Sequence, residues 1–196
     1  MPAPFAESRL NAFIKSIEAE YRRYKALADA ALAQVPEPLL SQPGPAGGNS
    51  LTVTCWHLSG NLQSRFTDFL TSDGEKLWRH RDEEFRLRTA SRAELTQQWD
   101  AGWRALFGAL VDLTDSDLTK TVQIRGQPLL VHEALHRSLA HAGYHVGQIV
   151  YLAKAICGAS WRYLSIPPDG SAAYNANPQY ENAADHAGAL GRETAT

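Results

Sequence analysis

Histidines at helical spacing are the residues of this sequence best suited to metal chemistry. The stretch HEALHRSLAHAGYHVGQI holds two pairs, His132 with His136 and His141 with His145, each pair four residues apart. Two imidazoles one helical turn apart face the same way, and the first pair completes the H-E-x-x-H motif of zinc proteases. Because the two pairs cannot face one common site, the sequence poses a choice between them.

Helical geometry favours the second pair. A helix turns by about 100° per residue, so from His132 the side chain of His136 projects at about 40°, and those of His141 and His145 at about 180° and 220°. We therefore interpret His141 and His145 as an interior pair, and His132 and His136 as part of a flank that faces solvent or another subunit. The apolar side of this helix, at about 200° to 280°, is formed by Ala134, Ser138, Ala142, Ile149, Leu152 and Ile156.

The rest of the motif does not support a zinc protease. Such an enzyme needs a third ligand, either a downstream glutamate or a histidine in an extended motif. Leu139 stands where the extended motif has glycine, and Ala142 stands where it has histidine. No Asp or Glu occurs between Glu133 and Asp169. We interpret the H-E-x-x-H pattern as a chance repeat.

A third ligand for the interior pair is available from another helix. In CWHLSGNLQSRF, His57 shares the apolar surface of its helix with Leu58 and Leu62. Catalytic metal sites take three protein ligands and leave one position open, and His57, His141 and His145 match that count. Neutral imidazole binds zinc, nickel, copper or iron. On the residues alone, three hydrogen-bonded core histidines remain an alternative.

Several polar residues are candidates for supporting roles. Asn61 lies one turn after His57, and Gln148 lies beside the interior pair, so either is a candidate to orient a ligand imidazole or to contact substrate, or is an ordinary interior amide. Arg65 is a candidate for an anionic substrate, although a surface arginine with a buried stem is the simpler interpretation. The catalytic base is unknown. Acidic residues in the connector between the second and third predicted helices are candidates if that connector folds over the mouth of the bundle, but we favour a solvated charged loop. These residues are Asp73, Glu75, Asp82, Glu83 and Glu84.

Four amphipathic helices are predicted to position these residues. Val122 and Ile124 alternate with polar residues before Arg125-Gly126, which predicts a short β-hairpin ahead of the last helix. The first predicted helix spans residues 7–35, and the second runs from residue 49 or 50 to about residue 70. The third begins at a capping box formed by Ser91 and Glu94. The fourth spans residues 130–157 and is ended by Gly158.

Together these elements predict an all-α protein. Long helices with short or modest links are typical of a four-helix bundle, which we expect over residues 1–175. Residues 176–196 are small and polar, and we expect a loosely held or disordered C-terminal tail there.

Composition narrows the class of protein. The chain has 196 residues and a net charge of −2, which argues against a nucleic-acid partner. No apolar stretch approaches the roughly 18 residues of a membrane span, and the first residues lack the pattern of a secretory signal. Cys55 and Cys157 are the only cysteines, too few for a disulfide framework. We expect a cytoplasmic protein with reduced thiols and no membrane partner.

Three segments together resemble the DinB/YfiT-like superfamily, and within it an uncharacterised bacterial branch. They are WHLSGNLQSRFTDFLTSDGEK, HAGYHVGQIVYLAK and LSIPPDGSAAYN, and the resemblance covers about residues 7–175. It implies a DinB-like four-helix bundle with a divalent metal, zinc or nickel, held by one histidine of the second helix and two of the last. By position these are His57, His141 and His145, which helical geometry also selects.

The resemblance also implies a range of activities, because characterised relatives include thiol-dependent transferases and isomerases. We expect a metal-dependent enzyme that acts on a small-molecule substrate, with a low-molecular-weight thiol as a further cofactor, and we allow for a homodimer. The alternative is a non-catalytic bundle that binds metal or a small molecule in a stress or resistance role. Nuclease or DNA-repair activity gains no support from the near-neutral charge.

Overall fold

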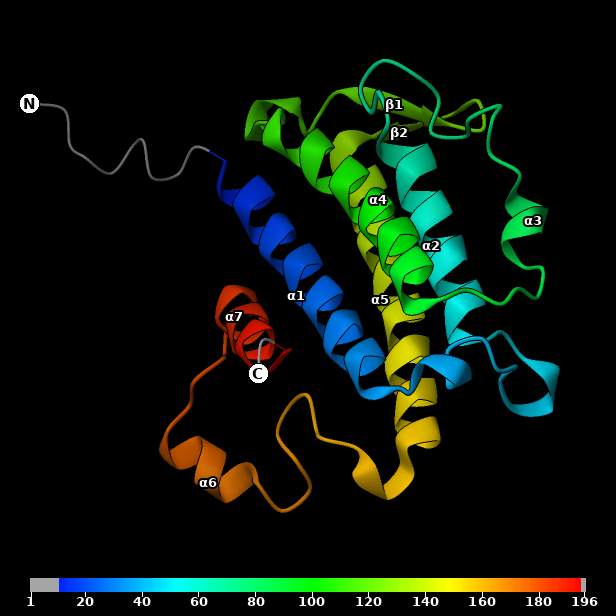
Figure 1. Ribbon diagram of the computed structural model, residues 1–196. Coiled ribbons are helices and arrows are strands. Elements are labelled where there is room, and N and C mark those ends of the chain that lie inside the picture. The colour runs from blue at the N-terminus through cyan, green and yellow to red at the C-terminus, as the bar shows by residue number, and fades with distance from the viewer. Residues whose placement is uncertain (1–10, 195–196) are drawn as a thin grey trace, which may run out of the picture.

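The computed structural model describes residues 11–194, and helices form most of it (Figure 1). This confirms a mostly helical protein with a hairpin before the last long helix. The strands β1 (Thr121–Ile124) and β2 (Gln127–Leu130) pair antiparallel, and short 3₁₀ helices cover residues 37–39, 45–47, 115–117 and 158–160. The α-helices are α1 (Ala12–Gln34), α2 (Leu51–Phe66), α3 (Arg81–Glu84), α4 (Arg92–Val111), α5 (Val131–Cys157), α6 (Ser171–Ala176) and α7 (Ala183–Thr194).

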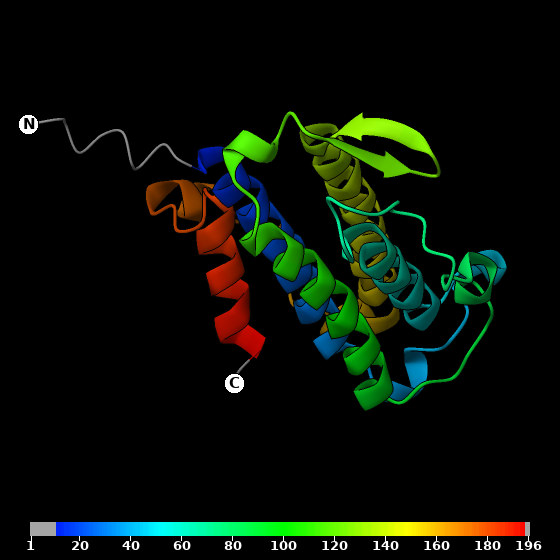
Figure 2. The same cartoon turned by 90° about the horizontal axis from the view of Figure 1, so that it is seen from above.

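The four long helices α1, α2, α4 and α5 run side by side. Helix α2 packs along α4, α1 packs along α5, α2 also contacts α5, and a smaller contact joins α1 to α4. Figures 1 and 2 show this arrangement, with the hairpin at the N-terminal end of α5. Within residues 11–194, no helix is both long and apolar enough to cross a membrane.

One apolar core lies between these helices. Each long helix contributes a side chain with almost no exposed surface, among them Tyr21, Leu58, Trp103 and Leu135. The Tyr21 hydroxyl donates a hydrogen bond to the Leu135 carbonyl oxygen at 2.9 Å, which satisfies a buried polar group and joins α1 to α5. This packing fixes the faces of α2 and α5 that meet each other.

N-cap residues fix where two of the long helices, α2 and α4, begin. The Ser50 hydroxyl accepts the Val53 N–H at 3.1 Å at the start of α2. At the start of α4, Ser91 and Glu94 form the predicted capping box, in which the Glu94 carboxylate accepts the Ser91 N–H at 2.8 Å. Such caps stabilise a helix by about 1 kcal/mol.

The hairpin turn is fastened to the loop that follows α2. Arg125 and Gly126 have φ values of 57° and 69°, as a two-residue type I′ turn requires. The Asp73 carboxylate accepts the N–H of Arg125 at 2.8 Å and that of Gly126 at 2.6 Å. The hairpin therefore lies in a fixed position over the ends of α2 and α5.

Some element boundaries differ from those predicted. Helix α2 ends at Phe66, before the predicted end near Leu70, because Thr67 is extended and Asp68 has a φ of 50°. The connector interpreted as a solvated loop contains α3, and α6 lies after α5, where no helix is predicted. The predicted start of the first helix at Glu7 lies outside the described residues.

The C-terminal segment holds more structure than its composition predicts. Where a loosely held tail is expected, α7 packs against α1 (Figure 1). Leu190 is 3% exposed, and His186 contacts the Leu164 carbonyl oxygen at 2.9 Å. A single leucine among small residues does not form an apolar stripe, so the sequence does not predict the contact of α7 with α1. The division of the chain near residue 175 stays a prediction.

Close packing of α2 on α4 generates a prediction about Gly102. A Cβ atom at Gly102 would lie 2.6 Å from the Ser59 Cα atom, so Gly102→Ala forces the two helices apart. We expect the free energy of unfolding to fall by about 1–3 kcal/mol. Urea denaturation of the purified variant measures this change.

The matched control lies on the same helix. A Cβ atom at Gly108 would meet nothing within 4 Å, so Gly108→Ala is expected to stabilise the protein by up to about 1 kcal/mol through helix propensity. Equal unfolding free energies for the two variants would contradict this account of the α2–α4 contact.

Candidate metal centre

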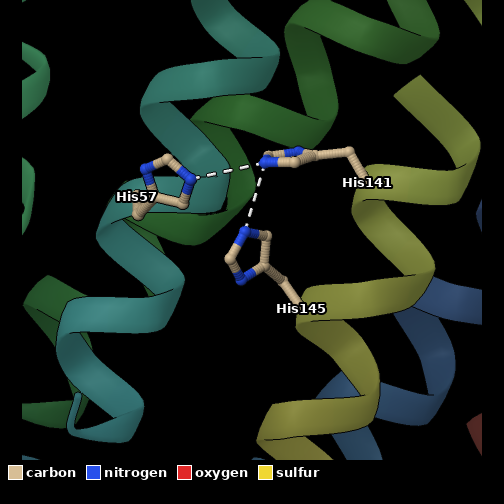
Figure 3. Close-up of side chains that lie close together, drawn as sticks. All are labelled: His57, His141 and His145. Atoms are coloured by element: carbon tan, nitrogen blue, oxygen red, sulfur yellow. Dashed lines mark hydrogen bonds between the residues drawn. The ribbon is translucent and has the colours of Figure 1, made fainter. Parts of the chain in front are cut away.

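Three histidine side chains from two helices meet between α2 and α5. His57 extends from α2, and His141 and His145 extend from α5 toward it (Figure 3). The His141 Nε2 atom lies 3.4 Å from the His57 Nε2 atom and 3.1 Å from the His145 Nε2 atom. The ligand atoms of all three lie within 4.8 Å of one another. The structure therefore brings together the three histidines selected from the sequence.

Helical packing explains why these side chains meet. His57 is 4% exposed beside the core residue Leu58, and His145 is 8% exposed beside Val146. His141 is half-buried, one turn before His145. Because the surrounding apolar side chains hold both helix faces in contact, the imidazoles are placed by the core of the protein rather than by a loop.

The hydrogen bonds of the outer ring nitrogens fix which nitrogen carries the proton. His57 Nδ1 lies 2.9 Å from Glu84 Oε2, and His145 Nδ1 lies 2.9 Å from Gln148 Oε1. A carboxylate and an amide oxygen only accept hydrogen bonds, so both Nδ1 atoms donate. In the neutral ring, which is the form that binds metals, the Nε2 atoms of His57 and His145 then carry the lone pairs, and both lie close to the Nε2 atom of His141.

This donor set fits a divalent metal. A neutral His141 can donate at most one proton from its Nε2 atom, whereas the Nε2 atoms of His57 and His145 are two acceptors. The three rings therefore cannot satisfy both acceptors by hydrogen bonds among themselves. Nitrogen ligands at about 2.0–2.1 Å from a tetrahedral zinc ion lie about 3.3–3.4 Å apart, close to the observed 3.1 and 3.4 Å. The residues present fit three-histidine coordination.

Burial keeps two of the three imidazoles, those of His141 and His145, neutral. Burial, together with the nearby rings of His145 and His57, lowers the pKa of His141 to about 3. Burial also lowers the pKa of His145, against the opposing effect of the Gln148 hydrogen bond. Neutral imidazole is the form that binds metals, so at neutral pH no proton competes for the Nε2 lone pairs of these two residues.

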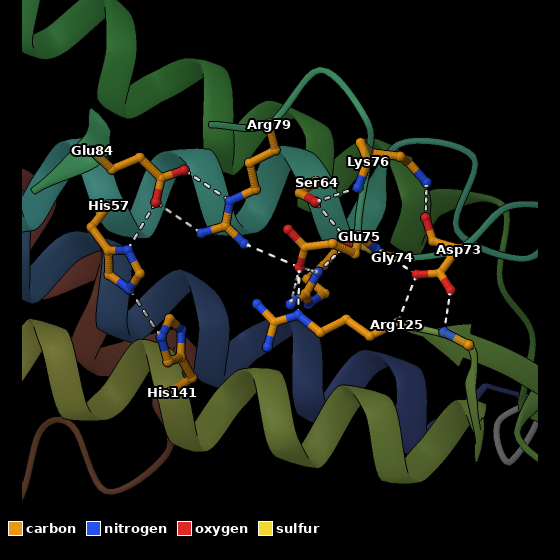
Figure 4. Close-up of polar contacts among 12 residues, drawn as sticks. His57, Ser64, Asp73, Gly74, Glu75, Lys76, Arg79, Glu84, Arg125 and His141 are labelled. Carbon is orange, nitrogen blue, oxygen red and sulfur yellow. Dashed lines mark hydrogen bonds and ion pairs between the residues drawn. The ribbon is translucent and has the colours of Figure 1, made fainter. Parts of the chain in front are cut away.

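A buried ion pair holds His57 in place. The Glu84 carboxylate accepts the His57 hydrogen bond and also pairs with Arg79 through two hydrogen bonds of 2.8 Å (Figure 4). Burial acts to raise the pKa of Glu84, but the hydrogen bonds from Arg79 and His57 outweigh it and the pKa is lowered. Glu84 therefore stays ionised, and a carboxylate behind a ligand histidine fixes its orientation and raises its basicity.

A glycine of α2 makes room for this carboxylate. A Cβ atom at Gly60 would lie 2.2 Å from Glu84 Oε1. Glycine inside a helix costs up to about 1 kcal/mol relative to alanine, and here it permits the close approach of Glu84 to α2. This helix-interior glycine was the one sequence signal that could have pointed to a partner on that side of His57.

The two amides predicted to support the site occupy different positions. Gln148 contacts His145 directly, although Gln148 is an exposed residue. Asn61 makes no contact with a ring nitrogen of the three histidines and lines the neighbouring cavity with His57. Asn61 is thus placed to contact a ligand of the cavity rather than to orient His57, which Glu84 already does.

The H-E-x-x-H pair lies away from this cluster. His132 Nδ1 lies 2.9 Å from the Leu118 carbonyl oxygen, and the exposed His136 packs its ring against Phe13 at 5.4 Å between ring centres. The flank of α5 that carries the pair was expected to face solvent or another subunit. That expectation was wrong in part, because Phe13 and Tyr24 of α1 cover it at His136 and Gly143.

The acidic connector is not the uniformly solvated loop that the sequence suggests. Asp82 and Glu83 are exposed, whereas Glu84 is 8% exposed. Glu75 pairs with Arg65, whose side chain is only 11% exposed. The interpretation of Arg65 as a surface arginine was therefore wrong. Spacing alone did not reveal the roles of Glu84 and Arg79, because both residues lie in a segment without periodicity.

A cavity of about 210 Å³ opens beside the histidine cluster. It lies between α2, α5, the hairpin and the loop after α2, and His57 and His141 form part of its wall. The cysteines take no part, since Cys55 is buried in the core and Cys157 donates a hydrogen bond to the Gln34 carbonyl oxygen at 3.3 Å. The remaining polar lining includes Asn61, Arg65, Arg79, Arg125 and Ser138.

Comparison with known proteins gives one family. A family model described as "Protein of unknown function (DUF1572)" matches residues 8–170. The matched region includes the three histidines, Glu84 and every residue that lines the cavity. No curated protein matches the chain.

The Arg79–Glu84 pair generates a prediction about stability. Glu84→Ala leaves the Arg79 guanidinium buried without its partner, and losing one member of a buried pair costs about 3–5 kcal/mol. Glu83→Ala is the matched control, because Glu83 is an exposed neighbour and surface changes stay within about 0.5 kcal/mol. Chemical denaturation of both variants compares them, and similar losses would contradict a buried role for Glu84.

Proposed function

The chain belongs to the family of proteins of unknown function DUF1572, and we propose that it is a DinB-like, divalent-metal-dependent enzyme. In this proposal α1, α2, α4 and α5 constitute a four-helix bundle, and His57, His141 and His145 hold the metal. The observation that carries it is the convergence of three Nε2 atoms beside a cavity, with the lone pairs of His57 and His145 fixed by hydrogen bonds at the opposite ring nitrogen.

Zinc or nickel is the proposed metal. Both bind neutral imidazole, and the lowered pKa values of His141 and His145 keep those rings in that form. The cluster contains no thiolate and no carboxylate ligand among the described residues, so softer sulfur-bound or harder oxygen-bound metals fit it less well.

The residues of the chain prepare the site for one type of chemistry. When bound at three protein ligands, a divalent metal supplies Lewis acidity that lowers the pKa of a water or thiol at its open position. Glu84 and Gln148 hold His57 and His145 in the orientation and tautomer that ligation needs. Packing of α2 on α5 leaves His57 and His145 with little exposed surface, and the cavity beside His57 and His141 has room for a small molecule.

Transfer or isomerisation with a low-molecular-weight thiol is the proposed reaction class. None of the residues that line the cavity is Asp or Glu, and Glu84 is bound by Arg79 and His57. A hydroxyl nucleophile would need a base to remove its proton, whereas a thiol with a lowered pKa is already ionised near neutral pH. Low-molecular-weight thiols are kept reduced in the cytoplasm, which is the proposed location.

The lack of an Asp or Glu in the cavity lining also supports a second candidate function. Without a free carboxylate in the cavity, the protein also suits a non-catalytic role in binding metal or a small molecule. Turnover distinguishes the two functions: an enzyme consumes a thiol together with an electrophilic small molecule, whereas a binding protein shifts its melting temperature with either ligand and consumes neither.

Metal removal tests the proposed site. A ligand that binds only the folded state adds about 2.7 kcal/mol at a hundredfold excess over its dissociation constant. The core is large and apolar, so the metal-free chain is expected to stay folded, unlike a zinc finger. Treatment with phenanthroline, an uncharged chelator, should lower the melting temperature and leave the helical circular dichroism spectrum intact.

Two histidine variants complete this test. His145→Ala removes one of three ligands, and we expect the metal-dependent rise in melting temperature to disappear. His136→Ala, in the same helix but away from the cluster, should retain the full rise. A full rise in His145→Ala would show that His145 is a core residue and not a ligand, and outright unfolding on chelation would make the metal a structural element.

A further inference from the structure

Positive charge dominates the wall of the cavity beside the histidines. Its lining residues come from α2, the loop after α2, the start of α3, the hairpin and α5, and none of them is acidic. A volume of about 210 Å³ is below the roughly 300–1,000 Å³ of sites for drug-sized ligands, so the cavity suits a small molecule. Five arginines line it, Arg65, Arg79, Arg81, Arg125 and Arg137.

The neighbouring carboxylates neutralise only part of this charge. Glu75 Oε2 lies 3.1 Å from nitrogens of both Arg65 and Arg125. Glu84 is paired with Arg79. The two carboxylates of Glu75 and Glu84 therefore pair with three arginines, which leaves one positive charge without a matching negative charge.

The other two arginines add further positive charge. Asp82 lies 3.7 Å from Arg81, but its side chain is 98% exposed to solvent, where a single ion pair contributes little. The exposed side chain of Arg137 makes no hydrogen bond or ion pair with any residue that the structure describes. The cavity wall keeps a surplus of positive charge.

Arg79 supplies a buried donor that the protein does not satisfy. Its side chain is 1% exposed, and its Nη1 atom has no hydrogen-bond partner among the described residues. The nearest carboxylate oxygen, Glu75 Oε2, is 3.9 Å away, beyond hydrogen-bond distance. Burying a charged donor without a partner is costly, and an anion in the cavity would remove that cost.

Arg65 and Arg125 are held in position by the protein before any ligand arrives. Arg65 donates to Glu75 and to the Gly74 carbonyl oxygen, and Arg125 lies in the turn that Asp73 fastens (Figure 4). Fixed guanidinium groups lose little conformational freedom on binding. Their planar pairs of N–H groups match the two oxygens of a carboxylate or phosphate.

We propose that this arginine-lined cavity binds the anionic group, a carboxylate or a phosphate, of a small-molecule ligand. The bound anion lies between the hairpin and the histidine cluster, so the rest of the molecule extends toward His57 and His141. The anion site itself requires no metal; its role as the substrate site rests on the proposed function.

Calorimetric titration of the full chain with succinate and with inorganic phosphate tests this inference. Phenanthroline-treated protein is used, because an uncharged chelator does not compete for the arginines. We expect at least one probe to bind, and the preferred probe identifies the anionic group. Arg137→Gln and Arg125→Gln should each weaken binding about tenfold, as expected for loss of a charge-assisted hydrogen bond.

Arg104→Gln is the matched control, since Arg104 is an exposed residue of α4 outside the cavity lining. It should bind the probe as the unmodified chain does. Failure of both probes to bind, or equal binding by all three variants, would overturn the inference. Because the titration is free of metal, the two proposals can fail separately. A chain that binds the anion but no metal would support the anion site and contradict the proposed function. A chain that binds metal but no anion would support the metal site and contradict this inference.

Discussion

The Glu84 carboxylate is the group on which the organisation of the site depends. Through His57 it fixes one Nε2 lone pair toward α5, and through Arg79 it fixes one wall of the cavity. Because a buried carboxylate stays charged only with strong partners, these two contacts stabilise each other. The histidine cluster and the arginine-lined cavity are therefore two sides of one hydrogen-bonded network.

Close helix packing makes this network sterically feasible. Gly102 lets α4 approach Ser59 on α2, and Gly60 leaves space for Glu84 on another side of the same helix. Helix α2 thus contacts α4, Glu84 and the histidines of α5 at once. We expect larger residues at either glycine to move His57 relative to His141 and His145.

Periodic patterns made much of this structure predictable. The i, i+4 spacing and the apolar stripe of α5 identified His141 and His145 as an interior pair, and His57 followed from the stripe of α2. Neighbouring residues alone are enough to predict the helix caps at Ser50 and Ser91 and the turn at Arg125-Gly126. The parts that escaped prediction depend on contacts between distant segments: Glu84 on His57, the burial of Arg65 beside Glu75, and α7 against α1.

Metal content is the most direct measurement of the central claim, that three lone pairs on α2 and α5 form a metal site. Elemental analysis of the chain after equilibration with zinc or nickel and removal of free ion should give about one metal ion per chain. The variant His57→Ala/His141→Ala/His145→Ala should retain none, and His132→Ala/His136→Ala should retain the full amount. Absence of bound metal in the unmodified chain, or its loss only in the second variant, would contradict the account.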